Sequence, residues 1–296
     1  MDASRAVLVT GASSGIGRAC ALRLADGGFS VFAAVRKERD AEALREGPRG
    51  LVPVILDVTK PETISESLRI VRDAVAASGL SGLVNNAGIA VTGPIELLPL
   101  DELRRQFEIN VFGQVAVTQA FLPLIRVARG RIVNVGSVGA RFALPFGGGL
   151  NASKAAFESI SDSLRMELRP WGIRVVLVSP GSIRTSAEAK LVAASEAAVD
   201  AFSPEGKARY AASYRAFVQS LLRLESHGVG PEVVAGAVHR AMTARVPKRR
   251  YPVGPNSRLL PFVMTRLPTA VADALRLRLF HVSRPFGADA RREATA

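Results

Sequence analysis

A glycine-rich turn near the N-terminus has the residue types and spacing of a phosphate-binding site. The segment Thr10-Gly11-Ala12-Ser13-Ser14-Gly15-Ile16-Gly17 lies between an apolar run of strand length and a stretch of helical period. Gly11 permits a tight turn, Gly15 lets the backbone approach a pyrophosphate, and Gly17 allows close packing of the helix. The helix N-terminus then offers free N–H groups and partial positive charge to the phosphates. The segment therefore predicts a dinucleotide site.

A second segment has the spacing of an oxidoreductase active site. In Leu150-Asn151-Ala152-Ser153-Lys154, the first and last residues are four positions apart. Side chains with this separation share one face of a helix. The position that needs a proton donor, however, is occupied by Leu150, which cannot donate a proton or stabilise an oxyanion. General acid–base help contributes typically about 10²–10⁴-fold, so we expect proton delivery in this protein to be non-standard.

The elements that must position these residues alternate along the chain. Strands are expected at 6–10, 30–35, 52–56, 82–85, 131–135 and 173–178, and helices at 15–25, 61–77, 101–127 and 151–168. Fully apolar strands that alternate with helices predict a parallel sheet covered on both faces. Right-handed crossovers then give an α/β, doubly wound, Rossmann-like fold. The proline at 123 is expected to bend or end the third of the long helices.

We expect one domain with a C-terminal extension. Residues 1–255 form the dinucleotide-binding oxidoreductase domain, with an edge strand at 250–253 and an Ala-rich helical substrate lid at about 182–228. Residues 256–296 mix arginine with leucine, phenylalanine and valine. We expect this helical extension to pack on the body or on a partner. The alternative is peripheral contact with a membrane surface.

These motifs together resemble the short-chain dehydrogenase/reductase family, over roughly residues 5 to 255. The spacing Gly11-x-x-x-Gly15-x-Gly17 is that of the family, Asn85-Asn86-Ala87-Gly88 ends the fourth expected strand, and Ser137 precedes Leu150 by thirteen residues. The segments 31–36 and 250–254 resemble the branch that acts on steroids, retinoids and hydroxybutyrate.

The resemblance implies a role for each site residue. In the family, a tyrosine at position 150 exchanges a proton with the substrate oxygen, and Leu150 departs from that pattern. The resemblance further implies that Lys154 binds the nicotinamide ribose, that Ser137 hydrogen-bonds the substrate oxygen, and that Asn110 holds a water linked to Lys154. The cofactor residues that it implies are Gly11, Ser13, Ser14, Gly15, Ile16, Gly17, Arg36, Lys37, Asp57, Val58, Asn86, Ala87, Gly88, Lys154, Pro180, Gly181, Ile183 and Thr185.

The end of the second expected strand indicates which nicotinamide cofactor binds. An acidic residue there would chelate the ribose diol and select NAD. This chain has Arg36 and Lys37 instead, and no acid before Glu38. A guanidinium forms strong, often bidentate bonds with a phosphate. NADP(H) is therefore favoured over NAD(H), although both cations could also simply face solvent.

Leu150 leaves three interpretations open. In the first, Ser137 polarises a carbonyl while Lys154 or a water supplies the proton. In the second, hydride transfer goes to a bond that needs less oxygen activation, such as an activated C=C or an iminium. In the third, the protein binds the cofactor with impaired or no turnover, as a natural pseudoenzyme or an active-site variant. Tyr210 and Tyr214, in the lid, are either substitute donors or packing residues.

The apolar segment before Leu150 bears on the substrate. Phe142, Leu144 and Phe146 could form an apolar wall beside a run of glycines, or they could be ordinary core residues. The first interpretation predicts a bulky apolar substrate, taken as a carbonyl, an alcohol or an activated double bond. The resemblance also implies a homo-oligomer built on the helices at 101–127 and 151–168.

Composition narrows the remaining classes. The chain has 39 basic and 26 acidic residues, for a net charge of +13. This excess favours anionic partners, but the basic residues are not gathered with aromatics into one arm, so no nucleic acid is expected. The single cysteine, Cys20, and the lack of a signal-peptide pattern predict a cytoplasmic protein. The isolated histidines His227, His239 and His281 predict no metal site.

Overall fold

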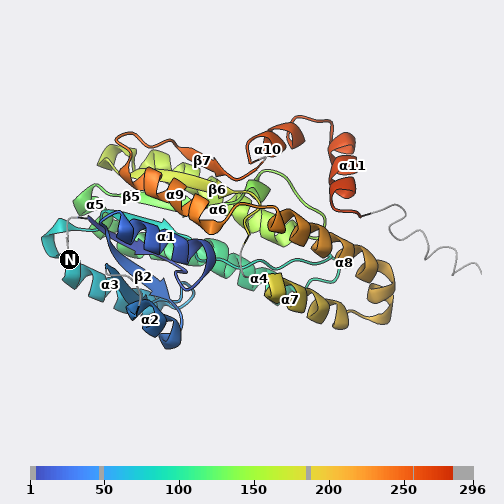
Figure 1. The fold of residues 1–296 in the computed structure, drawn as a ribbon, viewed down its shortest axis with the longest axis horizontal. Coiled ribbons are helices and arrows are strands. Elements are labelled where there is room, and N and C mark those ends of the chain that lie inside the picture. Colours follow the sequence, from blue (N-terminus) through green and yellow to red (C-terminus); the bar gives the residue numbers. More distant parts are fainter. Residues whose placement is uncertain (1–4, 47–49, 185–187, 256, 283–296) are drawn as a thin grey trace, which may run out of the picture.

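The computed structural model describes residues 5–46, 50–184, 188–255 and 257–282. In these residues one sheet of seven parallel strands has the order β3-β2-β1-β4-β5-β6-β7, with helices on both faces (Figure 1). The predicted doubly wound fold is confirmed. The strands are β1 Ala6–Val9, β2 Ser30–Val35, β3 Leu51–Ile55, β4 Gly82–Asn85, β5 Arg131–Val135, β6 Arg174–Pro180 and β7 Arg250–Val253.

The strands are apolar throughout because both faces of the sheet are covered. β1, β2 and β4 are buried along their whole length. On one face, α1 and α9 cover alternate residues such as Val7 and Val9, and on the other α3 and α5 cover Leu8. The sandwiching helices are α1 Gly15–Asp26, α2 Glu38–Arg45, α3 Pro61–Val75, α4 Leu100–Phe107, α5 Gly113–Ala128, α6 Gly148–Glu167 and α9 Pro231–Thr243. Short 3-10 turns lie at Ala76–Ser78, Val138–Ala140 and Arg169–Trp171.

The helix expected at 101–127 is interrupted in a way that the sequence did not indicate. A π-helical turn, Glu108–Phe112, separates α4 from α5. Pro123 lies inside α5, and the helix continues beyond it to Ala128. By length and composition, 100–128 could cross a membrane, but Val117 and Phe121 are fully buried against the sheet. This segment is therefore part of the core, and its π turn at Glu108–Phe112 is of a kind that is frequent at functional sites.

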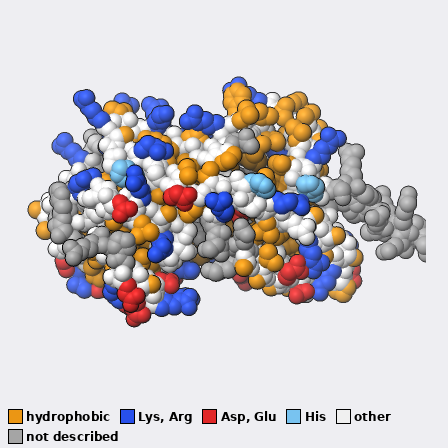
Figure 2. Space-filling view, in the orientation of Figure 1, with side chains coloured by type: hydrophobic (Ala, Val, Ile, Leu, Met, Phe, Trp, Pro, Cys, Tyr) orange, Lys and Arg blue, Asp and Glu red, His pale blue; other side chains and the backbone are white. Residues whose placement is uncertain are grey.

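Two further helical pairs lie beyond the sheet. α7 Glu188–Asp200 and α8 Pro204–Ser226 pack against each other, and their apolar cluster includes Tyr214 and Phe217. α10 Leu259–Met264 and α11 Thr269–Leu279 follow β7, with Met264 packed against Phe142. Part of the C-terminal extension thus rests on the loop that leads into α6. Apolar side chains gather over α10 and α11 on one face of the molecule, where Leu259 remains exposed (Figure 2).

One helix that was not predicted and one early helix start differ from expectation. α2 was not predicted, because an eight-residue helix rich in charge has a weak periodic signal beside the strands. α6 begins at Gly148, three residues before the predicted start at 151. Its glycines cost helix stability, yet Gly149 packs where an added Cβ would lie 2.9 Å from Leu103. Close packing therefore explains why glycine stands inside this helix, and it places residue 150 within the first turn.

Candidate active site

A cavity of about 310 Å³ lies at the carboxyl ends of β1 to β4, where the strand order reverses. Ligands of open α/β sheets bind at this switch point. The cavity contains the glycine turn and the residues that follow β2, β3 and β4. Its lining is Gly11, Ser13, Ser14, Gly15, Ile16, Gly17, Ala34, Val35, Arg36, Leu56, Asp57, Val58, Asn86, Ala87, Gly88, Ile89 and Ile109.

The glycine turn leaves no room for a side chain at Gly11 or Gly17. Gly11 has a φ of +65°, and an added Cβ would lie 2.9 Å from the Cα of Ala87. A Cβ on Gly17 would lie 2.1 Å from the carbonyl oxygen of Gly11. The side chain of Ser14, before α1, makes no capping hydrogen bond. The first N–H groups of α1 are thus available to an anion, and the turn fits a dinucleotide pyrophosphate.

Buried polar contacts join the glycine turn to the loop after β4. Thr10 Oγ1 accepts hydrogen bonds from the backbone N–H groups of Asn86 and Ala87, at 2.9 and 3.0 Å. The amide of Asn86 donates to the carbonyl oxygen of Thr10 at 3.0 Å. Asn86 therefore lines the cavity and also fixes its shape.

The ends of β2 and β3 carry the groups expected to face the adenosine half. Arg36 is exposed and lines the cavity, whereas Lys37 precedes α2 and does not line it. Glu38, the first acid after β2, is paired with Arg45 at 2.7 Å. Asp57 lines the cavity, and its carboxylate accepts bonds from the backbone and hydroxyl of Thr59. Arg36, which follows β2, therefore has no acidic residue on that strand beside it, and the next acid, Glu38, is paired with Arg45.

Lys154 lies beside the carboxyl end of β5 and the loop that follows β4. Its Nζ donates to the carbonyl oxygen of Val135 at 3.2 Å. A Cβ on Gly88 would lie 3.6 Å from Nζ and 3.1 Å from Asn110 Oδ1, so the side chains of Lys154 and Asn110 both lie close to Gly88. Burial lowers the pKa of Lys154 from 10.5 to about 8, against an opposing contribution from the carboxylate of Glu158. The ammonium can therefore lose its proton near neutral pH.

Asn110 lies in the π turn and fastens the loop after β4. Its amide donates to the carbonyl oxygen of Ile89 and accepts from the N–H of the same residue, both at 2.9 Å. It also donates to Ser153 Oγ at 3.0 Å, which in turn donates to the carbonyl oxygen of Leu150 at 2.8 Å. This chain of contacts fixes the first turn of α6. The water-holding role implied for Asn110 stays a prediction.

Ser137 follows β5 in extended conformation. Its Oγ accepts from the N–H of Gly139 at 3.0 Å, which leaves the hydroxyl proton for another acceptor. The next loop is held by Asn151, whose amide donates to the carbonyl oxygens of Gly139 and Phe142, both at 2.7 Å. Asn151 was not predicted as a site residue, although its position next to Leu150 could have indicated that it lies near the site.

The tyrosines considered as substitute donors are engaged elsewhere. Tyr214 is buried, and its hydroxyl bonds with both the side chain and the carbonyl of Thr92, each at 2.9 Å. Burial raises the pKa of this phenol. Tyr210 donates to the carboxylate of Glu96. Both rings pack edge-on against Phe146. These contacts join the lid to the loop at 89–99 and favour the packing interpretation of both tyrosines.

Several expected cofactor residues lie outside the cavity. Pro180 ends β6, the N–H of Gly181 donates to the carbonyl oxygen of Val253 at 2.8 Å, and Ile183 forms a bridge with Val229. Thr185 lies outside the described residues. Conversely, Leu56, Ile89 and Ile109 line the cavity but were not predicted. The signal for Ile89 was its position next to the motif ending at Gly88.

Comparison with known proteins decides the family. A family model described as short chain dehydrogenase matches residues 5–196. The chain belongs to the short-chain dehydrogenase family. This short-chain dehydrogenase is 37% identical over 279 residues to retinol dehydrogenase 5 of Mus musculus, covering 91% of this chain and 86% of that protein. It is 34% identical over 277 residues to the NADPH-dependent 3-dehydrocapnine reductase of Ornithobacterium rhinotracheale, covering 92% and 95%.

A solved structure gives the same assignment. The crystal structure of a short chain dehydrogenase from Burkholderia cenocepacia in complex with NADP has a TM-score of 0.65 and 27% identity, covering 93% of this chain and 96% of that chain. The predicted family is thus confirmed, and this short-chain dehydrogenase is an NAD(P)-dependent oxidoreductase.

Proposed function

We propose that the protein is an NADP(H)-dependent oxidoreductase that transfers hydride to or from a bulky apolar carbonyl or alcohol. The observation that carries this proposal is a cavity whose glycine turn fits a pyrophosphate, with Lys154 next to its lining residue Gly88. Lys154 also donates to the carbonyl oxygen of Val135, two residues before Ser137. When bound, the nicotinamide supplies or takes up the hydride. The chain supplies the binding site, the orientation and the proton.

Arg36 supports NADP(H) over NAD(H). It lines the cavity, and Glu38 is occupied by Arg45. A guanidinium at this place would pair with a 2′-phosphate, while a carboxylate that could chelate a ribose diol is not offered by β2. One relative is named as NADPH-dependent, and two structural neighbours are described as complexes with NADP.

Lys154 and Ser137 together would replace the tyrosine. The hydroxyl of Ser137 is free to donate to a substrate oxygen, because Oγ already accepts from Gly139. Lys154 has a pKa of about 8 as a result of burial, so its ammonium holds a transferable proton near neutrality. A catalytic acid is most effective when its pKa lies near the working pH. Lys154 would supply this proton directly or through a water.

The substrate is proposed to be apolar. Leu150 is a hydrocarbon residue where the family has a phenol. Phe146 packs on the aromatic residues of α8 as part of an apolar cluster. Sites with few polar groups favour apolar ligands. Two of the similar proteins are named as retinol dehydrogenases. Phe142, by contrast, packs under α10 as a core residue.

The competing proposal is a protein that binds the cofactor without turnover, and Leu150 is the observation that favours it. The two are distinguished by incubating the purified chain with NADPH and panels of apolar ketones, enones and imines. Turnover that falls in Ser137→Ala supports the enzyme. NADPH binding with no turnover on any panel contradicts the oxidoreductase proposal and supports the binder.

A further inference from the structure

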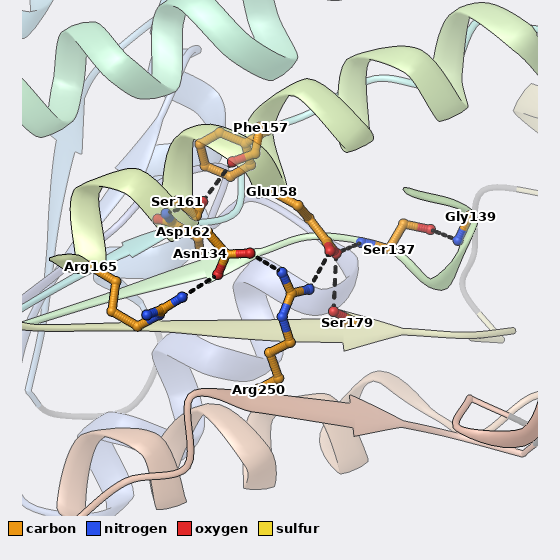
Figure 3. A network of polar contacts seen from close by, with 10 residues as sticks. All are labelled: Asn134, Ser137, Gly139, Phe157, Glu158, Ser161, Asp162, Arg165, Ser179 and Arg250. Atoms are coloured by element: carbon orange, nitrogen blue, oxygen red, sulfur yellow. Dashed lines mark hydrogen bonds and ion pairs between the residues drawn. The ribbon is translucent and has the colours of Figure 1, made fainter. Parts of the chain in front are cut away.

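A buried carboxylate lies directly behind the proposed catalytic residues. Glu158 is on α6, one helical turn after Lys154, and is 5% exposed. Its Oε1 accepts from Ser179 Oγ at 3.1 Å and from the backbone N–H of Ser137 at 3.4 Å. Its Oε2 accepts from Arg250 at 2.5 Å (Figure 3). One side chain thus contacts the segment after β5, the end of β6 and the start of β7.

The charge of Glu158 is compensated from the side away from Ser137. A buried carboxylate is costly unless it is paired and hydrogen-bonded. Arg250 provides the pair and also binds Asp162, which in turn binds Arg165 at 2.9 Å. The charges therefore alternate in a chain from Arg165 to Glu158 (Figure 3). Glu158 is the last residue of this chain of charges, and its Oε1 accepts hydrogen bonds from the backbone N–H of Ser137 and the hydroxyl of Ser179.

The backbone before Ser137 is shaped around this carboxylate. A Cβ on Gly136 would lie 2.4 Å from Oε1 of Glu158, so only glycine allows the carboxylate to approach. The N–H of Gly136 donates to the carbonyl oxygen of Val178 at 2.8 Å. The segment that leads into Ser137 is therefore held between β6 and Glu158. Ser137 receives its position from these two contacts rather than from its own side chain alone.

We propose that Glu158 is a positioning residue, which holds Ser137 through its backbone N–H and supplies the negative charge that acts on Lys154. This inference rests on the proposed function, because it assumes that Ser137 and Lys154 do the chemistry. It extends that function to a residue that touches neither the substrate nor the cofactor. Without the tyrosine, the substrate oxygen depends on Ser137 and Lys154 for its proton and its hydrogen bond. The positions of these two residues therefore affect the rate more strongly.

The electrostatic part of the proposal has a definite sign. The carbonyl of Val135, to which Lys154 donates from β5, and Gly88 in the loop after β4 are uncharged, and so is Asn110, which lies against Gly88 from the π turn. The charge that acts on Lys154 is that of Glu158, which favours the ammonium form. Neutralising this carboxylate therefore lowers the pKa of Lys154 further. The charges next along the chain are those of Arg250, Asp162 and Arg165.

Glu158→Gln tests the proposal, and Asp162→Asn is its matched control. Asp162 also binds Arg250 but contacts neither Ser137 nor Ser179 in the hydrogen bonds of the described residues. Amide hydrogen exchange of residues 136–141 reports the Ser137 contact without cofactor or substrate. Glu158→Gln keeps an oxygen that can accept from the N–H of Ser137 but removes its negative charge, and this weakening of a charge-assisted hydrogen bond predicts about a tenfold fall in protection there. Asp162→Asn leaves this segment close to the parent.

The pH dependence of NADPH binding, followed by its fluorescence, gives the second readout. Affinity falls as Lys154 loses its proton, and in Glu158→Gln this fall comes at a pH lower by about half a unit or more. Asp162→Asn keeps the parent midpoint. Glu158→Asp keeps the negative charge, so the pH midpoint of NADPH binding stays that of the parent. Its shorter side chain moves the carboxylate away from the N–H of Ser137, so exchange at 136–141 increases. This variant also serves if Glu158→Gln does not fold.

The outcomes separate the two proposals. If the parent binds no dinucleotide, the proposed function fails, whatever the exchange data show. If the parent binds NADPH but Glu158→Gln matches Asp162→Asn in both exchange and pH midpoint, Glu158 is only a structural ion-pair partner and the inference is overturned. The inference is also overturned by a second set of results. In that set, Glu158→Gln raises exchange uniformly over the whole chain and keeps the parent's pH midpoint, and Glu158→Asp leaves exchange at 136–141 unchanged.

Discussion

Replacing Leu150 by tyrosine should raise carbonyl reduction by at least about 10²-fold, the lower bound for a positioned acid. The residue is half-buried in the first turn of α6, and its backbone is fixed by Ser153. Lys154 lies one turn further along the helix, so a phenol at 150 would share its face. The side chain at position 150 can thus be replaced while the backbone of the first turn of α6 keeps its position.

The magnitude follows from comparing two free energies. Enlarging a packed side chain costs about 1–3 kcal/mol of stability, whereas a gain of 10²–10⁴-fold corresponds to about 2.7–5.4 kcal/mol of transition-state stabilisation. Because residue 150 is only half-buried, the stability cost falls at the low end of its range. The ammonium of Lys154 would also favour the phenolate when the proton is delivered.

The assay compares kcat/KM for NADPH oxidation by an apolar ketone in the parent, Leu150→Tyr and Leu150→Phe. Phenylalanine matches the size of tyrosine without its hydroxyl, so we expect it to give no gain. Lys154→Ala in the Leu150→Tyr background should remove the gain. If Leu150→Tyr gains nothing while NADPH still binds, the active-site assignment around Lys154 is wrong; if Leu150→Phe gains as much, the effect is one of shape.

Four other outcomes follow from the same geometry. Gly17→Ala should weaken NADPH binding at least about tenfold, since its Cβ would meet a carbonyl oxygen at 2.1 Å; Gly236→Ala, where the nearest atom lies at 3.6 Å, should bind like the parent in the same titration. Arg36→Ala should lower affinity for NADP but not NAD, as measured by calorimetry; an equal loss for both would contradict the 2′-phosphate contact. Reductase activity should decline as pH rises through about 8, because Lys154 has its pKa lowered to that value and loses its proton there; a rate profile flat from pH 7 to 9 would exclude Lys154 as the acid. Phe112, 57% exposed on the π turn, should contribute to a homo-oligomer, so Phe112→Asp should sediment as a smaller species; a parent that already sediments as a monomer would contradict this.

The fold was predictable because the sheet is buried on both faces. Strands such as β1 and β2 are apolar at every position but the first of β2, and a glycine turn with this spacing directly after β1 is typical of a dinucleotide-binding fold. Helix boundaries were less predictable. Asn110 in the π turn hydrogen-bonds Ile89, which is 21 residues away, and the local sequence does not reveal such a contact. Likewise, α6 starts early because Gly149 packs against α4.

The sequence predicted cavity residues that lie in the glycine turn or follow strand ends, such as Gly15 and Gly88; the role of Lys154 stays a prediction. Contacts between distant segments were not predicted. Glu158 meets Arg250 from 92 residues away, and Tyr214 meets Thr92 across 122. No spacing rule connects such pairs. The missing tyrosine was visible in the sequence, but the low pKa of Lys154 follows from burial that only the structure shows.

Hydride transfer by the parent chain tests the central claim most directly. NADPH deuterated at the transferable position is incubated with the protein and an apolar ketone, and the alcohol is examined by mass spectrometry. We expect a deuterated alcohol whose formation depends on Ser137 and declines above about pH 8, as Lys154 loses its proton. Tight NADPH binding without any deuterium transfer, to ketones or to enones and imines tested alongside, would contradict it.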